Sequence, residues 1–294
     1  MNIAITGGSG FIGRALGSRL RAASHRVTSV SLRTAPLPEA FASCDAVVNL
    51  AGEPVAQRWT AAARERILSS RVQATRSLVA ALRDRPPGVL SPRVLVSASA
   101  VGYYGSRGDE VLTEQAAPAG DFLANVCVGW EEEALAAESF GVRVVTPRIG
   151  VVLGPNGGAL QQMMLPFKMG VGGRLGSGRQ WMSWIHLDDL SALIEFAIAT
   201  PALRGPVNAT APNPVTNAEF TRELAAVLHR PAIFPVPAFA LQLLFGEMSQ
   251  VLLGSQRAIP EAALRAGFEF RYSDAGLALA ASFGSHKTSG APSA

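Results

Sequence analysis

The feature that most constrains the fold is a glycine-rich turn between the first apolar run and the first helical pattern. Residues 2–6 read as a buried strand, and Gly-Gly-Ser-Gly-Phe-Ile-Gly follows at residues 7–13. Gly7 lets the chain turn sharply, Gly10 leaves the backbone open to a ligand, and Gly13 lets the helix pack close to the strand. The helix N-terminus then offers unpaired N–H groups and a positive dipole to phosphates. The turn therefore predicts a dinucleotide site rather than a structural bend alone.

The rest of the N-terminal half alternates short β-branched runs with helical patterns. Further strands are expected at residues 26–32, 46–50, 93–97 and 142–147, and helices at 11–23, 59–82 and 121–140, with later helices at 217–228 and 239–253. This alternation implies right-handed crossovers and a parallel sheet that is covered on both faces. The sequence therefore predicts an α/β fold with a Rossmann-type, doubly wound parallel sheet.

The end of the second strand indicates which dinucleotide binds. A fold of this type that prefers NAD carries an acid about 20 residues after the glycines, where it holds the ribose hydroxyls. Residues 31–34 here are Ser-Leu-Arg-Thr, and no acid occurs between Arg33 and Glu39. Arg33 can pair with a 2′-phosphate, and Ser31 can donate a hydrogen bond to it. We therefore expect NADP as the cofactor.

The pattern changes after about Gly154, where glycine becomes dense as far as Gly178. We predict an NADP-binding Rossmann domain at residues 1–154. Residues 155–283 would add the last sheet elements and a small, mainly helical domain, with the substrate in the cleft between the two. Residues 284–294 are rich in Gly, Ser, Ala and Pro and are expected to form a flexible tail.

Composition and charge exclude several classes of protein. The chain has 294 residues, of which 48% are hydrophobic and 16% charged, which is a globular composition. No apolar run approaches the ~18–20 residues of a membrane span, and the scattered basic residues form no arm for nucleic acid. Cys44 and Cys127 cannot build a disulfide framework or a zinc site alone. We expect a small-molecule substrate, no metal, no membrane or nucleic-acid partner, and a cytoplasmic location; a homodimer stays open.

Several motifs resemble the extended short-chain dehydrogenase/reductase superfamily. They are the glycine turn, Asn49-Leu50-Ala51-Gly52, Pro147-Arg148 with residues 152–155, and the stretch Trp184–Leu190. Residues 49–53, Ser69-Ser70-Arg71 and Gly254-Ser255-Gln256-Arg257 are more similar to one atypical branch, the "epimerase family" proteins. These have a short helical C-terminal domain and are often described as nucleoside-diphosphate-sugar epimerases. The resemblance extends to about Phe283.

The resemblance implies a set of cofactor contacts beyond the glycines. By position, the pyrophosphate would meet Gly10, Phe11 and Ile12. The adenosine and its ribose would lie along Leu50, Ala51 and Gly52. The nicotinamide would be flanked by Ser97 and the segment around Arg148.

The sequence departs from the superfamily at its catalytic pair. The usual chemistry needs Tyr-x-x-x-Lys on a helix, where the lysine lies on the same face as the tyrosine and lowers its pKa. The residues four places after the three tyrosines are Arg107, Gly108 and Gly276, so the pair is absent. If Glu131 marks the usual register, Leu123 occupies the tyrosine position and Cys127, expected as a small buried side chain, the lysine position.

Three interpretations remain open. In the first, the chain is an NADP-dependent oxidoreductase, epimerase/dehydratase or reductase whose acid–base groups have moved to Tyr103, Glu53 and His186. It would act on a carbonyl or hydroxyl of a sugar-like or nucleotide-linked substrate. Each residue also has a plainer role: Tyr103 could pack over the nicotinamide, Glu53 could hold ribose hydroxyls, and His186 could orient a loop. In the second, the chain is a non-catalytic NADP(H)-binding sensor.

In the third interpretation, the C-terminal helices of a regulatory or interaction protein contact a partner. The apolar cluster that would do so comprises Leu241, Leu243, Leu244, Phe245, Val251, Leu252 and Leu253. We favour the alternative that this cluster covers the substrate side of the sheet. The first interpretation, an enzyme, instead predicts a pocket formed by Glu53, Tyr103, Arg148 and His186. Trp181 and Trp184 could form one wall of it.

Overall fold

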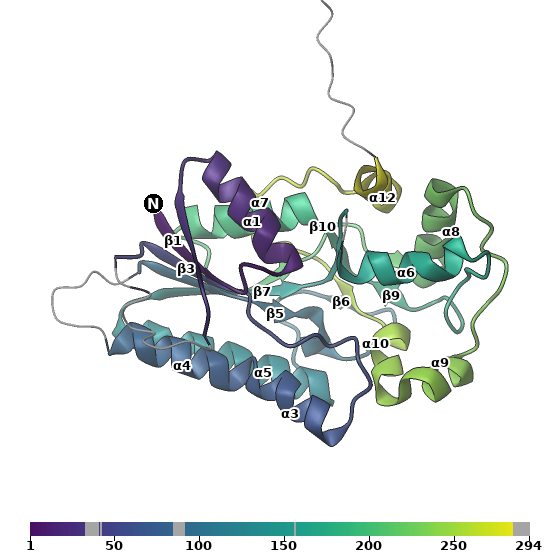
Figure 1. Cartoon of the computed structure of the whole chain (residues 1–294), viewed down its shortest axis with the longest axis horizontal. Coiled ribbons are helices and arrows are strands. Elements are labelled where there is room, and N and C mark those ends of the chain that lie inside the picture. Colours follow the sequence, from purple (N-terminus) through teal and green to yellow (C-terminus); the bar gives the residue numbers. More distant parts are fainter. Residues whose placement is uncertain (33–40, 42, 85–91, 156, 285–294) are drawn as a thin grey trace, which may run out of the picture.

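The computed structural model describes residues 1–32, 41, 43–84, 92–155 and 157–284. A parallel sheet with the order β11-β7-β4-β3-β1-β2 runs through the molecule (Figure 1). Its strands are β1 (Asn2–Thr6), β2 (Arg26–Val30), β3 (Ala46–Asn49), β4 (Val94–Ser97), β7 (Arg143–Ile149) and β11 (Gly205–Ala209), and β5 (Ser99–Ala100) pairs with β7. Because the order reverses between β1 and β3, the carboxyl ends of these two strands border the crevice where such folds bind nucleotides. The predicted α/β, Rossmann-type fold is confirmed.

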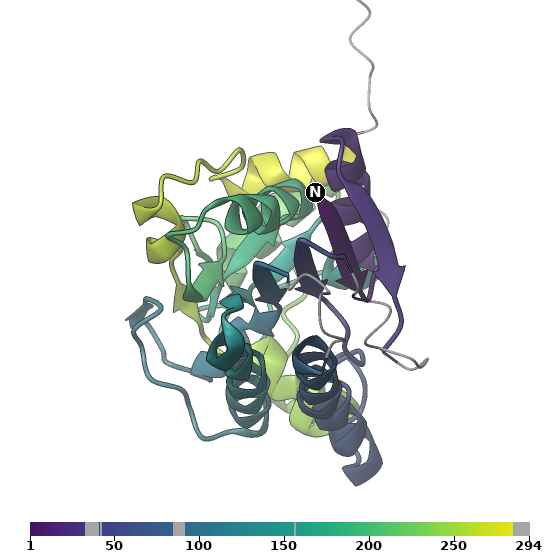
Figure 2. The same ribbon diagram turned by 90° about the vertical axis from the view of Figure 1, so that its left-hand side faces the viewer.

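Two layers of helices cover the faces of the sheet, as Figures 1 and 2 show. Alternate strand residues face opposite layers: Ile3 and Ile5 join one core with the helices α1 (Phe11–Ala22) and α7 (Leu187–Ala199), whereas Ala4 joins the other. That second core lies under α4 (Val72–Arg83) and α5 (Phe122–Leu135). The strands are apolar on both faces because both faces are buried.

The long helix expected at residues 59–82 is two helices, α3 (Ala61–Ser69) and α4. Thr60 caps α3 by accepting a hydrogen bond from the Ala63 N–H at 3.2 Å. Between the helices the Ser70 hydroxyl accepts a hydrogen bond from the Glu53 N–H at 2.9 Å, which ties the break to the loop after β3. The break contains no glycine or proline, so the helical pattern did not reveal it. Its consequence is the position of Arg71 beside that loop.

A second, smaller core lies at the other end of the molecule. It is built around Trp184 and Phe220 and packs α6 (Gly158–Lys168) against α8 (Asn217–Leu228) and α12 (Ala275–Phe283). Three two-stranded sheets connect this part to the rest: β8 (Val151–Leu153) with β10 (Trp184–His186), β9 (Trp181–Met182) with β12 (Val215–Thr216), and β6 (Val111–Leu112) with β13 (Arg257–Ala258). The helix α12 was not predicted. No helix among the described residues is long and apolar enough to cross a membrane.

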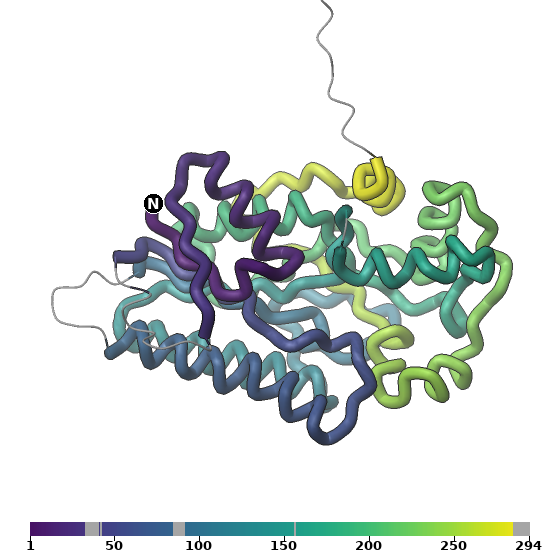
Figure 3. Tube along the Cα trace, viewed as in Figure 1, coloured from purple at the N-terminus to yellow at the C-terminus, as the bar shows by residue number. Residues whose placement is uncertain are grey.

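The expected helix at residues 239–253 is also interrupted. It forms α9 (Ala238–Phe245), a 3-10 turn at Gly246–Met248 and α10 (Ser249–Leu253), and α11 (Glu261–Arg265) follows. Figure 3 shows this segment at the edge of the molecule. Leu241 is buried, but Leu243 is 79% and Leu244 65% exposed. The prediction that the apolar cluster covers the sheet is therefore wrong for Leu243 and Leu244, because α9 turns only one side toward the protein.

Candidate functional site

The glycine turn has the geometry that its sequence predicts. Gly7 has φ +69°, and a Cβ there would lie 2.6 Å from the carbonyl oxygen of Leu50. A Cβ on Gly13 would lie 2.3 Å from the carbonyl oxygen of Gly7. The N-cap of α1 is Gly10, no side chain caps the helix, and its first turn holds no acidic residue. The first N–H groups of α1 are therefore open to an anion at the switch between β1 and β3.

A buried network holds the strand ends around this turn. Asn49 accepts a hydrogen bond from the Thr6 hydroxyl at 2.6 Å and donates to the hydroxyls of Thr75 at 2.9 Å and Ser97 at 3.1 Å. These contacts tie the carboxyl ends of β1, β3 and β4 to α4. Ser97 is fully buried, and its hydroxyl is taken up by Asn49. Its place beside the nicotinamide stays a prediction.

The segment after β8 covers the start of α1. The ring of Phe11 lies so close to Gly157 and Gly158 that Cβ atoms there would stand 2.5 Å and 2.8 Å from it. A Cβ on Gly154 would likewise lie 3.2 Å from the Phe11 ring. The glycine density after residue 154 thus has a packing cause, because side chains at these positions would push the segment off Phe11. Ile12, the other predicted contact of this turn, is half-buried.

Arg71 is a cation that lies against the loop after β3. A Cβ on Gly52 would lie 3.0 Å from its guanidinium carbon. Nη1 donates to the carbonyl of Ile67 at 3.2 Å, and the guanidinium lies 5.2 Å from the ring of Trp130. No described carboxylate forms an ion pair with it, and its Nε and Nη2 donate to no described protein group. Because Nε and Nη2 have no described protein partner, this half-buried cation has donors left for a ligand. Burial lowers the pKa of Arg71.

Cys127 connects Arg71 to the missing catalytic pair. The side chain is buried, as predicted, and burial raises the pKa of its thiol to about 11, although the charge of Arg71 opposes this rise. If Glu131 marks the family register, Cys127 occupies the lysine position, and the guanidinium of Arg71, the N-cap residue of α4, supplies a positive charge near it. Sequence reasoning missed this role. A signal was present, since no acid stands three or four residues from Arg71 on its helix.

Arg148 takes a structural place rather than the expected place at the cofactor. Its guanidinium forms two hydrogen bonds of 2.8 Å with Glu131 and donates to the Tyr104 hydroxyl at 3.0 Å and the Glu114 carbonyl at 3.2 Å. The side chain is 3% exposed. The Ser99 hydroxyl completes the site by donating to Glu131 at 2.6 Å. Four of the five N–H groups of Arg148 donate to these protein groups, so its guanidinium is held in the buried site rather than at the cofactor.

The three proposed acid–base residues do not converge. Tyr103 lies with its ring 3.4 Å from the guanidinium carbon of Arg148, on top of the buried pair. Glu53 accepts from Gln57 at 3.3 Å and forms an ion pair with Arg66 at 3.5 Å. Of the four residues predicted to form a pocket, Tyr103 and Arg148 are in contact, whereas Glu53 pairs with Arg66.

His186 is the N-cap of α7. Its Nδ1 accepts from the Asp188 N–H at 3.2 Å, and its ring packs 4.1 Å from that of Tyr272. The side chain is buried, and burial lowers its pKa. This placement matches the plainer alternative, in which the histidine orients a loop.

Two further predictions concern the contacts of the 2′-phosphate. Ser31 is exposed just after β2, and Arg33 lies outside the described residues.

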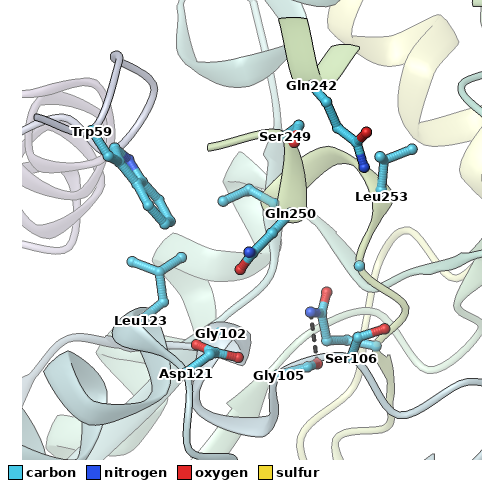
Figure 4. A pocket seen from close by; sticks show the side chains of 13 residues that line it. Trp59, Gly102, Gly105, Ser106, Asp121, Leu123, Gln242, Ser249, Gln250 and Leu253 are labelled. Atoms are coloured by element: carbon cyan, nitrogen blue, oxygen red, sulfur yellow. Dashed lines mark hydrogen bonds between the residues drawn. The ribbon is translucent and has the colours of Figure 1, made fainter. Parts of the chain in front are cut away.

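A cavity of about 330 Å³ lies at the carboxyl edge of the sheet, between the turn after β5 and the C-terminal helices (Figure 4). Trp59 comes from the loop before α3, Leu123 from α5 and Gln250 from α10. Leu123, which the register set by Glu131 would place at the tyrosine position of the family pattern, lines this cavity. Trp181 and Trp184 do not line it. Sequence reasoning missed Trp59 and Gln250, which meet only through the fold.

Comparison with known proteins agrees with this geometry. The model of the NAD dependent epimerase/dehydratase family matches residues 3–209, and a domain of unknown function, DUF1731, matches residues 236–282. The chain belongs to the NAD-dependent epimerase/dehydratase family. The resemblance to its "epimerase family" branch is also confirmed. Epimerase family protein MT2273 of Mycobacterium tuberculosis is 46% identical over 94% of this chain and 96% of its own length.

Two further relatives show how widely this branch occurs. The chloroplastic SDR39U1 homologue of Arabidopsis thaliana is 44% identical over 92% of this chain and 84% of its own length. The crystal structure of human epimerase family protein SDR39U1 (isoform 2) contains NADPH and superposes with a TM-score of 0.87 at 36% identity, covering 96% of this chain and 99% of the human one. A member of the same branch therefore binds NADPH on this fold.

Proposed function

We propose that the protein binds NADPH and exchanges hydride between this cofactor and a carbonyl or hydroxyl of a small substrate. The observation that carries the proposal is the glycine turn, where Gly7 packs on the backbone of Leu50 and the uncapped start of α1 faces the crevice. A Cβ at Gly7 would collide with the backbone of Leu50, and one at Gly13 with the backbone of Gly7, so a side chain at either position would distort the turn. The NADPH-bound human relative supports the choice of cofactor.

The chain's own residues suit the parts of NADPH. The N–H groups of Phe11, Ile12 and Gly13 would hold the pyrophosphate, and residues 50–52 would line the adenosine and ribose. Ser31 and Arg33 would meet the 2′-phosphate. The spare donors of Arg71 would hold ribose hydroxyls near the nicotinamide, where the superfamily's lysine would otherwise stand. The cofactor itself supplies the hydride.

Proton transfer has two candidates within the chain. The Tyr103 hydroxyl donates to no described protein group, and Glu53 lies on the loop that borders the cofactor crevice. His186 is not carried into the proposal, because it caps α7. Leu123 in the tyrosine position favours the second function, an NADPH-binding sensor without turnover, since a leucine moves no proton.

The two functions separate in one experiment. The protein is loaded with NADPH deuterated at the transferable position and incubated with a panel of aldehydes, ketones, free sugars and sugar nucleotides, and deuterium in the products is measured. An enzyme transfers deuterium, and we expect Tyr103→Phe or Glu53→Gln to reduce the rate while the Kd for NADPH stays unchanged. Tight NADPH binding without transfer to any compound would overturn the enzyme and establish the sensor.

A further inference from the structure

The cavity opposite the cofactor crevice is almost free of charge. Among the described residues that line it there is no lysine, arginine or histidine, and Asp121 is the only ionisable side chain. One carboxylate oxygen of Asp121 accepts the Ala124 N–H at 3.0 Å and so caps α5. The helix end that could attract an anion is thus already occupied by a negative group.

Two arginines close to the cavity wall are paired with carboxylates, and Arg257, next to Gln256 in the wall, lies 4.1 Å from the ring of Trp181. Arg107, next to Ser106 in the wall, forms two hydrogen bonds of 2.9 Å with Glu110. Arg64 pairs with Glu247 at 2.8 Å and lies 4.5 Å from the ring of Phe122. A diphosphate confined to the cavity would face the carboxylate of Asp121 and neutral groups, because no described residue that lines it is one of the cations that proteins use for phosphate.

The polar groups of the cavity are neutral amides and hydroxyls. The side-chain amides of Gln242 and Gln250 make no hydrogen bond to the described protein, and Figure 4 shows that of Gln250 pointing across the cavity toward Leu123. Each amide offers two donors and one acceptor. Gln256 donates to the Gly105 carbonyl at 2.8 Å and holds the opposite wall in place.

Trp59 supplies a fixed apolar wall. Its indole N–H donates to the Val55 carbonyl at 3.0 Å, and its ring makes an edge contact with Phe122, with the ring centres 5.3 Å apart. The ring extends toward Leu123 and Gln250 (Figure 4). A rigid aromatic wall opposite free amides suits a compact ligand with C–H faces and hydroxyl edges.

We propose that this cavity binds an uncharged, hydroxylated carbonyl compound of monosaccharide size and disfavours nucleoside diphosphates. The inference rests on the proposed NADPH-dependent function, because it takes the ligand of the cavity as the partner of the hydride. It narrows the sugar-like or nucleotide-linked substrate suggested by the sequence to the first of these two classes.

The test is a set of saturation-transfer NMR titrations of the full chain with D-glucose, D-xylose and UDP-glucose, each with and without NADPH. We expect a free sugar to bind and UDP-glucose to bind more weakly. Gln250→Leu removes one neutral hydrogen-bonding group and should weaken the binding of the free sugar roughly 3- to 10-fold. Gln250→Arg should strengthen the binding of UDP-glucose. Gln73→Leu, an exposed position on α4, is the matched control and should change neither.

The proposal is overturned if UDP-glucose binds the wild-type chain as tightly as the free sugars, if neither free sugar binds, or if Gln250→Leu behaves like Gln73→Leu. Calorimetric titration with NADPH alone is done first and tests the proposed function separately. If the wild-type chain does not bind NADPH, the proposed function is contradicted. If it binds both NADPH and UDP-glucose tightly, only the proposed ligand class is contradicted.

Discussion

At the scale of single residues, Arg71 links the cofactor loop to the place of the missing lysine. Its position depends on the break between α3 and α4, which brings the guanidinium under Gly52. An arginine there can hold a ribose through its hydrogen-bond donors. It does not by itself restore acid–base chemistry, because Leu123 offers no proton. The replacement is therefore one of binding and positioning.

Arg71→Ala should raise the Kd for NADPH about tenfold or more, because charge-assisted hydrogen bonds contribute ~1.5–3 kcal/mol each. Isothermal calorimetry measures the change. Arg76→Ala is the matched control, since Arg76 is exposed on the same helix and pairs with Glu133 at 2.5 Å. Equal Kd values for the Arg71 variant and the control would contradict the role proposed for Arg71.

His186 gives the fold a dependence on pH. Burial holds the pKa of its imidazole below the ordinary 6.5, against the charges of Asp188 and Asp189. Below pH 6.5 the unfolded chain therefore binds more protons at this site than the folded chain, so stability that is complete above this pH is lost as the pH falls. His186→Asn keeps a capping side chain and should flatten the decline. Urea unfolding between about pH 7 and pH 5 tests this; an unchanged slope would refute it.

At the scale of elements, the packing of α1 on β1 depends on one glycine and not on another. A Cβ on Gly13 would meet the Gly7 carbonyl oxygen at 2.3 Å, whereas on Gly17 it would meet only the flexible end of Arg21 at 3.2 Å. Gly13→Ala should lower the free energy of unfolding by about 1–3 kcal/mol and weaken the binding of NADPH. Gly17→Ala should stay within ~1 kcal/mol of the wild type. Similar losses in both would show that the turn is not packed as described.

The helix α9 provides a second matched pair. Leu241 is 4% exposed and Leu243 is 79% exposed. Leu241→Ala should therefore cost ~2–5 kcal/mol of unfolding free energy, and Leu243→Ala less than ~0.5 kcal/mol. Chemical denaturation measures both. A large loss for Leu243→Ala would mean that this face is covered in solution, as it would be in the homodimer that the sequence leaves open.

The elements show where sequence reasoning succeeds and where it stops. Local patterns predict β1, the glycine turn and α1 because strand, turn and helix lie within a few residues of one another. The break at Ser70 and Arg71 depends on the Glu53 N–H, which lies 17 residues away from Ser70 in the chain. The turn at Gly246 shows the same limit, since a glycine inside a helical pattern does not by itself mark a break.

At the scale of the whole molecule, the sheet order and the position of the nucleotide crevice follow from strand–helix alternation and the handedness of crossovers. The meeting of distant side chains does not. Arg148 was expected at the cofactor because its motif resembles that region, yet its charge is neutralised by Glu131 inside the protein. The cavity likewise joins Trp59, Leu123 and Gln250, whose proximity no local pattern records.

The central claim is that this chain binds NADPH at the crevice between β1 and β3. Calorimetric titration of the full chain with NADPH and with NADH, for the wild type and for Arg33→Ala, tests it most directly. We predict that NADPH binds more tightly than NADH and that the variant narrows the difference between the two affinities. Binding of neither dinucleotide, or tighter binding of NADH, would contradict the claim.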